Sequence, residues 1–236
     1  MAELNGRARS VYVRAMFGRI ARRYDLMNRL MTLGGDLLWR RFAVRKAELP
    51  AGGVLLDLAT GTGDVAFTAL RQVNGLTVVG ADFSLPMLRV GRGRPLGERV
   101  AWCAADALHL PFPDGEFDGG ISAFQLRNLP PESLADSFAE QARVVKPGGR
   151  VVSLDTSRPP ENRARPLIDF HLYRVLPLLG RLFSDDVAAY FYLTDSTGGF
   201  KTAAELAALM RQSGLTGVSF RKFAAGAVAV HWGTKG

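Results

Sequence analysis

Glycines and acidic residues gather directly after an apolar run near the start of the chain, in the order Asp57-Leu58-Ala59-Thr60-Gly61-Thr62-Gly63-Asp64. Glycines at a turn from a strand into a helix let the backbone approach a ligand closely, and amide groups at the helix N-terminus supply hydrogen bonds. A dinucleotide-binding loop has a third glycine, and Ala66 stands at that position, where the pattern also tolerates alanine. The segment therefore predicts a bound cofactor, and NAD is one candidate.

Acidic residues recur at the ends of the next two predicted strands. Asp82 closes the second strand, about where a carboxylate would hold the ribose hydroxyls of a nucleotide. Asp106 and Ala107 end the third strand and precede Leu110-Pro111-Phe112, which marks a site for an adenine ring flanked by an acid. Any one of these aspartates could instead cap the following helix. Together with Asp57 and the glycines, they match a class I S-adenosylmethionine methyltransferase.

Alternating strands and helices must position these residues. Short apolar runs separated by amphipathic segments predict a parallel, doubly wound sheet. Lys146-Pro147-Gly148-Gly149 predicts a helix stop followed by a tight turn, and Thr202 with Glu205 predicts a capping box. We predict strands at 54–59, 76–82, 100–106, 117–124, 150–155, 218–224 and 227–232, and helices at 64–73, 84–91, 131–145 and 202–212.

The predicted fold class is α/β, with a Rossmann-like sheet of seven strands that is mostly parallel and has an antiparallel edge strand. Residues 11–48 predict two N-terminal helices that meet at Gly34 and Gly35. Residues 163–183 predict a helical lid or substrate-side insertion, because they interrupt the sheet pattern. We expect a helical cap over 1–50 and a methyltransferase domain over 51–236, with its insertion over 160–200.

The net charge of +8 is concentrated at the N-terminus. Residues 1–50 hold eleven Lys and Arg against four Asp and Glu, whereas the remaining residues hold nineteen against eighteen. Two interpretations stay open: this segment contacts an anionic membrane surface, or it forms a solvated arginine-rich helical face. Hydrophobic residues make up 47% and charged residues 22%, which excludes extended disorder.

Cysteine and histidine content limits the possible chemistry further. The single Cys103 cannot form an internal disulfide, and three scattered histidines give no zinc-binding spacing, so we expect no metal. No apolar run approaches the roughly 18 residues of a spanning helix, and the N-terminus lacks the apolar stretch of a signal peptide. We expect a cytoplasmic protein, with peripheral membrane contact as an option.

Several longer motifs resemble one family, from about Phe17 to Lys235. The sequence resembles the menaquinone and ubiquinone biosynthesis C-methyltransferases, which methylate demethylmenaquinol and related polyprenylated quinols. Its Tyr-Asp-Leu-Met-Asn and Leu-Arg-Asn pieces are specific to that family, whereas the glycine loop and Lys-Pro-Gly-Gly are shared among methyltransferases. The motifs are Phe17-Gly18-x-x-Ala21-x-x-Tyr24-Asp25-Leu26-Met27-Asn28, Leu38-Trp39-Arg40, Asp57 to Asp64, Leu126-Arg127-Asn128, Val144-x-Lys146-Pro147-Gly148-Gly149 and Tyr192-Leu193.

This resemblance implies S-adenosylmethionine as the cofactor. Ala123 stands where the family commonly has serine, so a hydroxyl contact to the cofactor is either missing or supplied by Ser122. The resemblance implies cofactor contacts from Thr62, Asp82, Asp106 and Ala107, in a pocket shaped by Asp57, Gly61 and Gly63.

Methylation of a quinol carbon needs a stabilised phenolate, since an unperturbed phenol titrates near pH ~10. Arg127, just past the fourth strand, is expected to stabilise that oxyanion, while a guanidinium is a poor proton acceptor. Asn128 could orient the hydroxyl, and Tyr24 and Asp25 of the N-terminal helices could close over the cofactor. His171 is the alternative base, because its pKa suits neutral pH.

Other functions use part of this pattern. A nucleic-acid methyltransferase would explain the basic N-terminus, but the chain lacks an amino-methylation motif and a recognition domain, so no nucleic acid is expected. A nucleotide-sensing module would need neither Arg127 nor the insertion. The expected substrate is a polyprenylated quinol, either demethylmenaquinol or a ubiquinone precursor, and the oligomeric state stays open.

Overall fold

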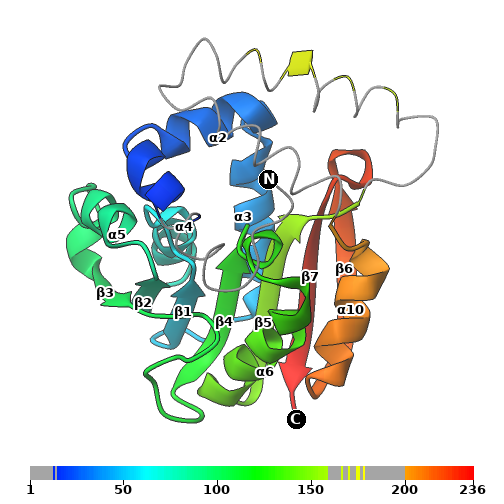
Figure 1. Cartoon of the computed structure of the whole chain (residues 1–236). Coiled ribbons are helices and arrows are strands. Elements are labelled where there is room, and N and C mark those ends of the chain that lie inside the picture. The colour runs from blue at the N-terminus through cyan, green and yellow to red at the C-terminus, as the bar shows by residue number, and fades with distance from the viewer. Residues whose placement is uncertain are drawn as a thin grey trace.

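A mixed sheet forms the centre of the computed structural model, which describes residues 13, 15–158, 166, 170, 174, 175, 178 and 200–236. Within these residues, seven strands lie in the order β3-β2-β1-β4-β5-β7-β6 (Figure 1). Strands β3 to β5 are parallel, whereas β7 pairs antiparallel with both β5 and β6, so the predicted fold class is confirmed. The strands are β1 (Val54–Leu58), β2 (Thr77–Asp82), β3 (Val100–Ala104), β4 (Phe117–Ala123), β5 (Val145–Thr156), β6 (Leu215–Phe223) and β7 (Val228–Lys235).

The strand order reverses between β1 and β4. From β1 the chain moves outward to β2 and β3, and it then returns to place β4 on the other side of β1. Leu58 at the end of β1 is in register with Ala81 of β2 and Ser122 of β4. The loops that follow β1 and β4 diverge at such a switch point and leave a crevice, which is where ligands bind in sheets of this type.

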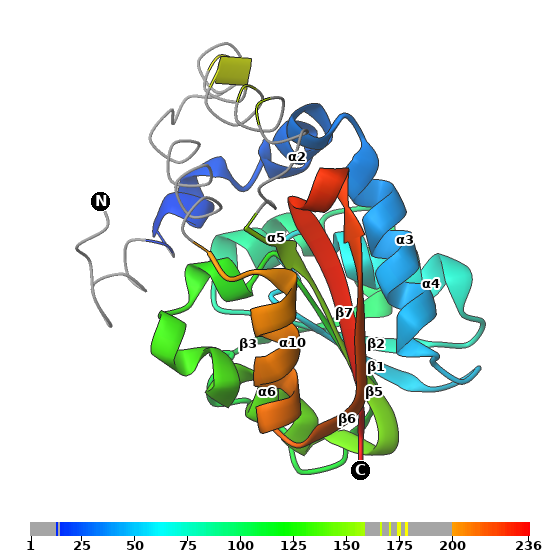
Figure 2. The ribbon, with the colours of Figure 1, turned by 90° about the vertical axis from the view of Figure 1, so that its right-hand side faces the viewer.

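Helices cover both faces of the sheet (Figure 2). α6 (Leu134–Val144) and α10 (Ala203–Gln212) lie on one face, with Phe138 and Leu206 fully buried between the helices and the strands. α3 (Gly35–Ala47) and α4 (Asp64–Gln72) lie on the other face, and α5 (Leu85–Arg92) packs beside β2 and β3. The predicted capping box is confirmed: Thr202 accepts from the amide of Glu205, whose carboxylate accepts from the amide of Thr202.

The helical N-terminal segment contains one more break than predicted. Residues 15–20 are helical, a turn occupies 21–23, and α2 (Tyr24–Thr32) follows, so the prediction of two helices is wrong there. The second break occurs as predicted, because Leu33 and Gly34 both adopt positive φ. The first break brings the Phe17 and Tyr24 rings into edge-to-face contact, with their centroids 5.7 Å apart. α2 consequently lies across the end of the sheet where β1 and β4 terminate (Figure 1).

The Lys-Pro-Gly-Gly segment is part of a strand and not a separate turn. β5 begins at Val145, five residues earlier than predicted, and its pairing with β4 shifts register between Phe117 and Gly119. A Cβ atom on Gly149 would lie 2.7 Å from the carbonyl oxygen of Asp118, so glycine is needed for this close approach. The helix stop itself is confirmed, since α6 ends at Val144.

The predicted insertion over 160–200, with His171, lies outside the described residues apart from the few positions given above. In the part of the chain that the structure describes, no helix is long and apolar enough to cross a membrane.

Candidate active site

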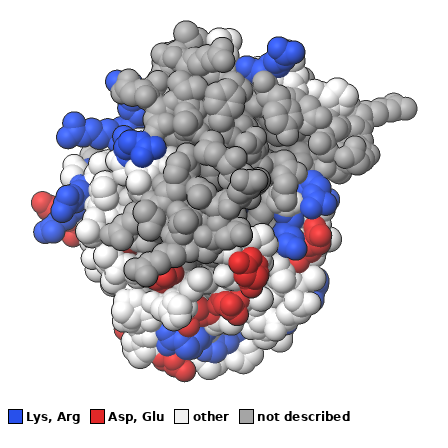
Figure 3. Space-filling view, in the orientation of Figure 1, with Lys and Arg blue, Asp and Glu red and all other residues white. Residues whose placement is uncertain are grey.

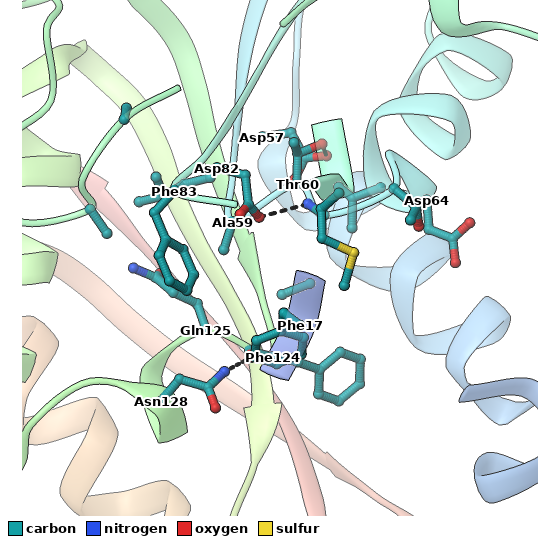
Figure 4. Close-up of a pocket in the computed structure, with 18 of the residues that line it drawn as sticks. Phe17, Asp57, Ala59, Thr60, Asp64, Asp82, Phe83, Phe124, Gln125 and Asn128 are labelled. Atoms are coloured by element: carbon teal, nitrogen blue, oxygen red, sulfur yellow. Dashed lines mark hydrogen bonds between the residues drawn. The ribbon is translucent and has the colours of Figure 1, made fainter. Parts of the chain in front are cut away.

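A pocket opens at the switch point of the sheet, under the N-terminal helices (Figure 4). Asp57, Asp82 and Thr60 lie on one side of it, and Phe124 and Asn128 lie on the other. Its remaining lining comes from Val13, Phe17, Tyr24, Arg40, Leu58, Ala59, Gly61, Thr62, Asp64, Val65, Phe83, Met87, Ala105, Asp106, Ala107, Ala123, Gln125 and Leu129.

The glycine loop turns tightly from β1 into α4. Ala59, Gly61 and Gly63 all adopt positive φ, at 55°, 57° and 90°. A Cβ atom on Gly63 would lie 2.8 Å from the Trp102 ring, so this glycine is required for packing as well as for its backbone angle. A Cβ atom on Gly61 would meet no atom within 4 Å among the described residues, so the loop leaves open space at Gly61.

Asp57 is a buried carboxylate at the base of this loop. Its Oδ2 accepts from the Thr60 hydroxyl at 2.6 Å and from the Ala66 amide at 2.9 Å. Its Oδ1 has no hydrogen-bond partner within the described chain, although Asp57 lines the pocket. Burial raises the pKa of Asp57 to about 7, since the charged form loses its hydration. Asp57 therefore carries one oxygen whose hydrogen-bonding capacity the described chain does not use.

Asp82 fastens the glycine loop to the end of β2. Its Oδ2 accepts from the Gly61 amide at 2.9 Å (Figure 4), and its Oδ1 accepts from the Ser84 amide at 2.8 Å. Burial raises the pKa of Asp82 to about 6. Each carboxylate oxygen has two lone pairs, so Asp82 can also bind hydroxyl groups of a ligand. Asp106 and Ala107 extend the same wall, where Asp106 accepts from the Leu108 amide at 3.0 Å.

Phe124 forms the opposite wall from a strained backbone. It follows β4 with φ of 56°, a conformation that is uncommon for a bulky residue and often marks a functional site. The guanidinium carbons of Arg40 and Arg127 lie 5.3 Å and 5.4 Å from the centroid of its ring. Asn128 donates to the Phe124 carbonyl at 3.0 Å (Figure 4), and its Oδ1 has no partner among the described residues.

Arg127 sets the electrostatics behind this wall. It is buried, and its charge opposes the effect of burial on the pKa values of Tyr24 and Asp155. Burial raises the pKa of Tyr24, and burial raises that of Asp155 to about 6, while Arg127 pulls both pKa values down. Asp155 also accepts from the Leu126 amide at 2.7 Å, which anchors the segment carrying Arg127 and Asn128 to β5.

Eight of the sequence-predicted site residues line the pocket: Tyr24, Asp57, Gly61, Thr62, Asp82, Asp106, Ala107 and Asn128. Three do not. Gly63 starts α4 behind the loop, and Arg127 lies behind Phe124 and Asn128. Ser122 is buried in β4, in register with Ser153, and the lining residue is its neighbour Ala123.

Sequence reasoning gave no role to several residues that line this pocket, namely Phe17, Arg40, Phe83, Phe124 and Gln125. Arg40 carried a signal, since it belongs to the quoted Leu38-Trp39-Arg40 motif. It is buried, and it pairs with Asp36 one helical turn earlier. Phe83, Phe124 and Gln125 carried only a positional signal. Phe124 ends one predicted strand, and Phe83 and Gln125 directly follow predicted strands.

The fold defines a class of protein, those with the Rossmann-like methyltransferase fold. Human N-acetylserotonin methyltransferase in complex with S-adenosylmethionine superposes with a TM-score of 0.62 at 19% identity, over 91% of this chain and 56% of that one. A methyltransferase of Thermotoga maritima gives a TM-score of 0.63 at 20% identity, over 94% and 99%. At such identities, the likeness establishes the fold alone.

The chain belongs to the ubiE/COQ5 methyltransferase family, whose model matches residues 5–235. It is 45% identical to the ubiquinone/menaquinone biosynthesis C-methyltransferase UbiE of Desulfotalea psychrophila, over 94% of this chain and 90% of that protein. It is 43% identical to the demethylmenaquinone methyltransferase of Thermus thermophilus, over 93% of this chain and 100% of the relative. The predicted family resemblance is therefore confirmed.

Proposed function

We propose that this protein transfers a methyl group from S-adenosylmethionine to a ring carbon of a polyprenylated quinol, namely demethylmenaquinol in menaquinone biosynthesis. The observation that carries the proposal is the pocket at the switch point, where strand-end acids face the Phe124 and Asn128 wall in front of Arg127. Membership of the ubiE/COQ5 family and the names of its relatives support the same reaction.

The pocket residues fit S-adenosylmethionine. The unpartnered Oδ1 of Asp57 suits the amino group of the methionine part, and the Asp82 carboxylate suits the ribose hydroxyls. Asp106 and Ala107 would border the adenine ring, with Phe83 as an apolar neighbour. The open space at Gly61 allows the ligand to approach the loop backbone.

The remaining chemistry depends on placing the quinol. When bound, S-adenosylmethionine supplies an electrophilic methyl group, so the chain must align the ring carbon and favour the phenolate. Asn128 Oδ1 is a free acceptor for the quinol hydroxyl within the described residues, and Tyr24 stays protonated because burial raises its pKa. Arg127 supplies the positive charge that stabilises the developing oxyanion.

Methyl transfer from radiolabelled S-adenosylmethionine tests the proposal directly. We expect label in reduced demethylmenaquinol, more slowly in a ubiquinone precursor, and none in nucleic acid. Mass spectrometry after deletion of the gene should show demethylmenaquinone accumulating. Cofactor binding without transfer to either quinol would favour a sensing module instead, and labelled nucleic acid would favour the other alternative.

We also propose that the protein draws its lipid-tailed substrate from an anionic membrane surface through the corner between α2 and α3. Leu33 is 87% exposed and Leu38 is 62% exposed at this corner. Exposed Arg22 precedes α2, and exposed Arg41 lies on α3. Basic side chains also border the upper left of the molecule in Figure 3. Exposed leucines and arginines in this N-terminal region match a bilayer with anionic headgroups.

Co-sedimentation with vesicles checks this membrane contact. Binding should be stronger to anionic than to neutral vesicles and should weaken with salt, since each basic residue near such a surface contributes about 1 kcal/mol. Leu33→Ser and Arg22→Ser should both reduce it. Arg71→Ser is the matched control, because Arg71 is exposed in the last turn of α4. This end of α4 is the one away from the glycine loop, where the Gly52 amide donates to the Asn74 carbonyl. Equal binding to both kinds of vesicle would instead support a solvated helical face.

A further inference from the structure

Six charged side chains form a cluster between the N-terminal helices and the glycine loop. Three are acids and three are arginines, so the cluster is balanced in charge. Arg29 donates to Asp64 at 2.7 Å, and Arg29 and Arg40 both pair with the buried Asp36. The members are Asp25 and Arg29 of α2, Asp36 and Arg40 of α3, Asp64 of α4, and Arg94, which follows α5.

Arg94 is the member that reaches the glycine loop itself. Its Nη1 lies 2.7 Å from Asp25 Oδ2, 3.0 Å from Asp64 Oδ1 and 3.1 Å from the carbonyl oxygen of Thr62. Its guanidinium carbon also lies 5.0 Å from the centroid of the Phe67 ring. This aromatic contact fixes the direction of the guanidinium group.

Asp25 also binds Thr62, through the threonine hydroxyl. Its Oδ1 accepts from the Thr62 hydroxyl at 2.5 Å, while its Oδ2 accepts from Arg94. Thr62 is therefore held at its hydroxyl by α2 and at its carbonyl by Arg94. The Thr62 hydroxyl thus donates to Asp25, while Thr62 also lines the pocket.

Without Arg94, the two carboxylates of Asp25 and Asp64 would face each other with less compensation. Burial and the nearby Asp64 charge already raise the pKa of Asp25. Asp64 keeps Arg29 as a second close partner, whereas the short contact of Asp25 with an arginine is the one to Arg94 among the described residues. Loss of Arg94 would thus act first on the link between Asp25 and Thr62.

We propose that Arg94 is a positioning residue that fastens α2 to the glycine loop through Asp25 and Thr62, and thereby sets the affinity for the cofactor. The proposal rests on the function proposed above. Gly61, Thr62 and Asp64 line the pocket, whereas Arg94 does not, so Arg94 acts on the cofactor through the glycine loop and the start of α4. Its loss should let the loop and the cap separate, which weakens cofactor binding. The methyl-transfer step at saturating cofactor should change little.

Calorimetry with S-adenosylhomocysteine and steady-state kinetics test this role. Arg94→Met and Asp25→Asn should each weaken S-adenosylhomocysteine about 10-fold, and the double variant should be no weaker than either single one, because both remove the same link. The KM for S-adenosylmethionine should rise by a similar factor, with kcat within about twofold. Arg94→Lys should restore part of the affinity. Arg92→Met, in the last turn of α5 and exposed, is the matched control and should bind as the parent does.

Several results of these measurements would contradict the role of Arg94. Unchanged affinity in Arg94→Met, additive losses in the double variant, or a fall in kcat at unchanged KM would each overturn the role of Arg94. Lower thermal stability at unchanged affinity would do the same, because it would show a structural contact only. A parent protein that binds neither S-adenosylmethionine nor S-adenosylhomocysteine would overturn the proposed function, and this inference with it.

Discussion

Arg127→Ala should lower the rate of methyl transfer by about 10² to 10³ and leave cofactor affinity within a few-fold of the parent. Arg127 lies behind Phe124 and Asn128, outside the lining of the pocket, so its removal does not alter the cofactor wall. Its positive charge lowers the pKa of Tyr24, a residue of the pocket lining, against the raising effect of burial. A quinol phenolate at the same wall would be stabilised in the same way.

The measurement compares turnover with reduced quinol at saturating cofactor, together with S-adenosylhomocysteine binding by calorimetry. Arg127→Lys is the matched control, since it keeps the charge but loses the planar fork of donors, and it should retain part of the rate. Thermal unfolding of each variant is measured as well, to separate a loss of stability from a loss of catalysis. Asp155 has a pKa of about 6 with Arg127 beside it, and loss of that arginine should raise this pKa further.

His171→Ala supplies the contrasting variant. If Arg127 provides electrostatic stabilisation and His171 is not the base, the histidine variant should lose far less activity than Arg127→Ala. The reverse result, with His171→Ala inactive and Arg127→Ala within a few-fold of the parent, would make His171 the proton acceptor and remove Arg127 from that role.

The sheet could be predicted because its central strands are buried on both faces. Val54–Leu58 reads as a short apolar run, and it is the middle strand of the parallel part. The acids at strand ends follow from the same pattern, since the carboxyl ends of parallel strands share one edge. Their meeting in one pocket therefore required no knowledge of side-chain packing.

The residues that the sequence did not reveal depend on tertiary packing. Nothing in Ala21-Arg22-Arg23 marks a helix break, because it contains neither glycine nor proline, yet the chain turns there to pack Phe17 against Tyr24. The positive φ of Phe124 is also invisible to propensity, since a bulky residue rarely adopts it. Local rules fail here because contacts from other elements override them.

The link between Asp25 and Thr62 shows a further limit. Both residues belong to family-like motifs, but Asp25 and Thr62 are 37 positions apart in the sequence, and no spacing rule joins them. Their hydrogen bond depends on how α2 lies over the strand ends, which the broken helix determines. The sequence thus located the parts of the site, whereas their pairing could be known only from the structure.

Asp82→Ala should weaken S-adenosylmethionine by about 10- to 150-fold, which corresponds to about 1.5 to 3 kcal/mol for losing hydrogen bonds to a charged group. Asp82 orders the Gly61 and Ser84 amides and faces the pocket. The substitution removes an acceptor for ribose hydroxyls and also frees the glycine loop from β2. Both effects lower affinity, so the loss should exceed that of a variant that affects the loop alone.

Calorimetry with S-adenosylmethionine and with NAD measures this prediction. Asp118→Ala is the matched control, because Asp118 also accepts from a backbone amide, that of Val54 at 2.7 Å, but it lies near the start of β4 and does not line the pocket. It should bind S-adenosylmethionine as the parent does. Unchanged affinity in Asp82→Ala would remove Asp82 from the cofactor site. Saturable binding of NAD in place of S-adenosylmethionine would show that the strand-end acids hold a dinucleotide instead.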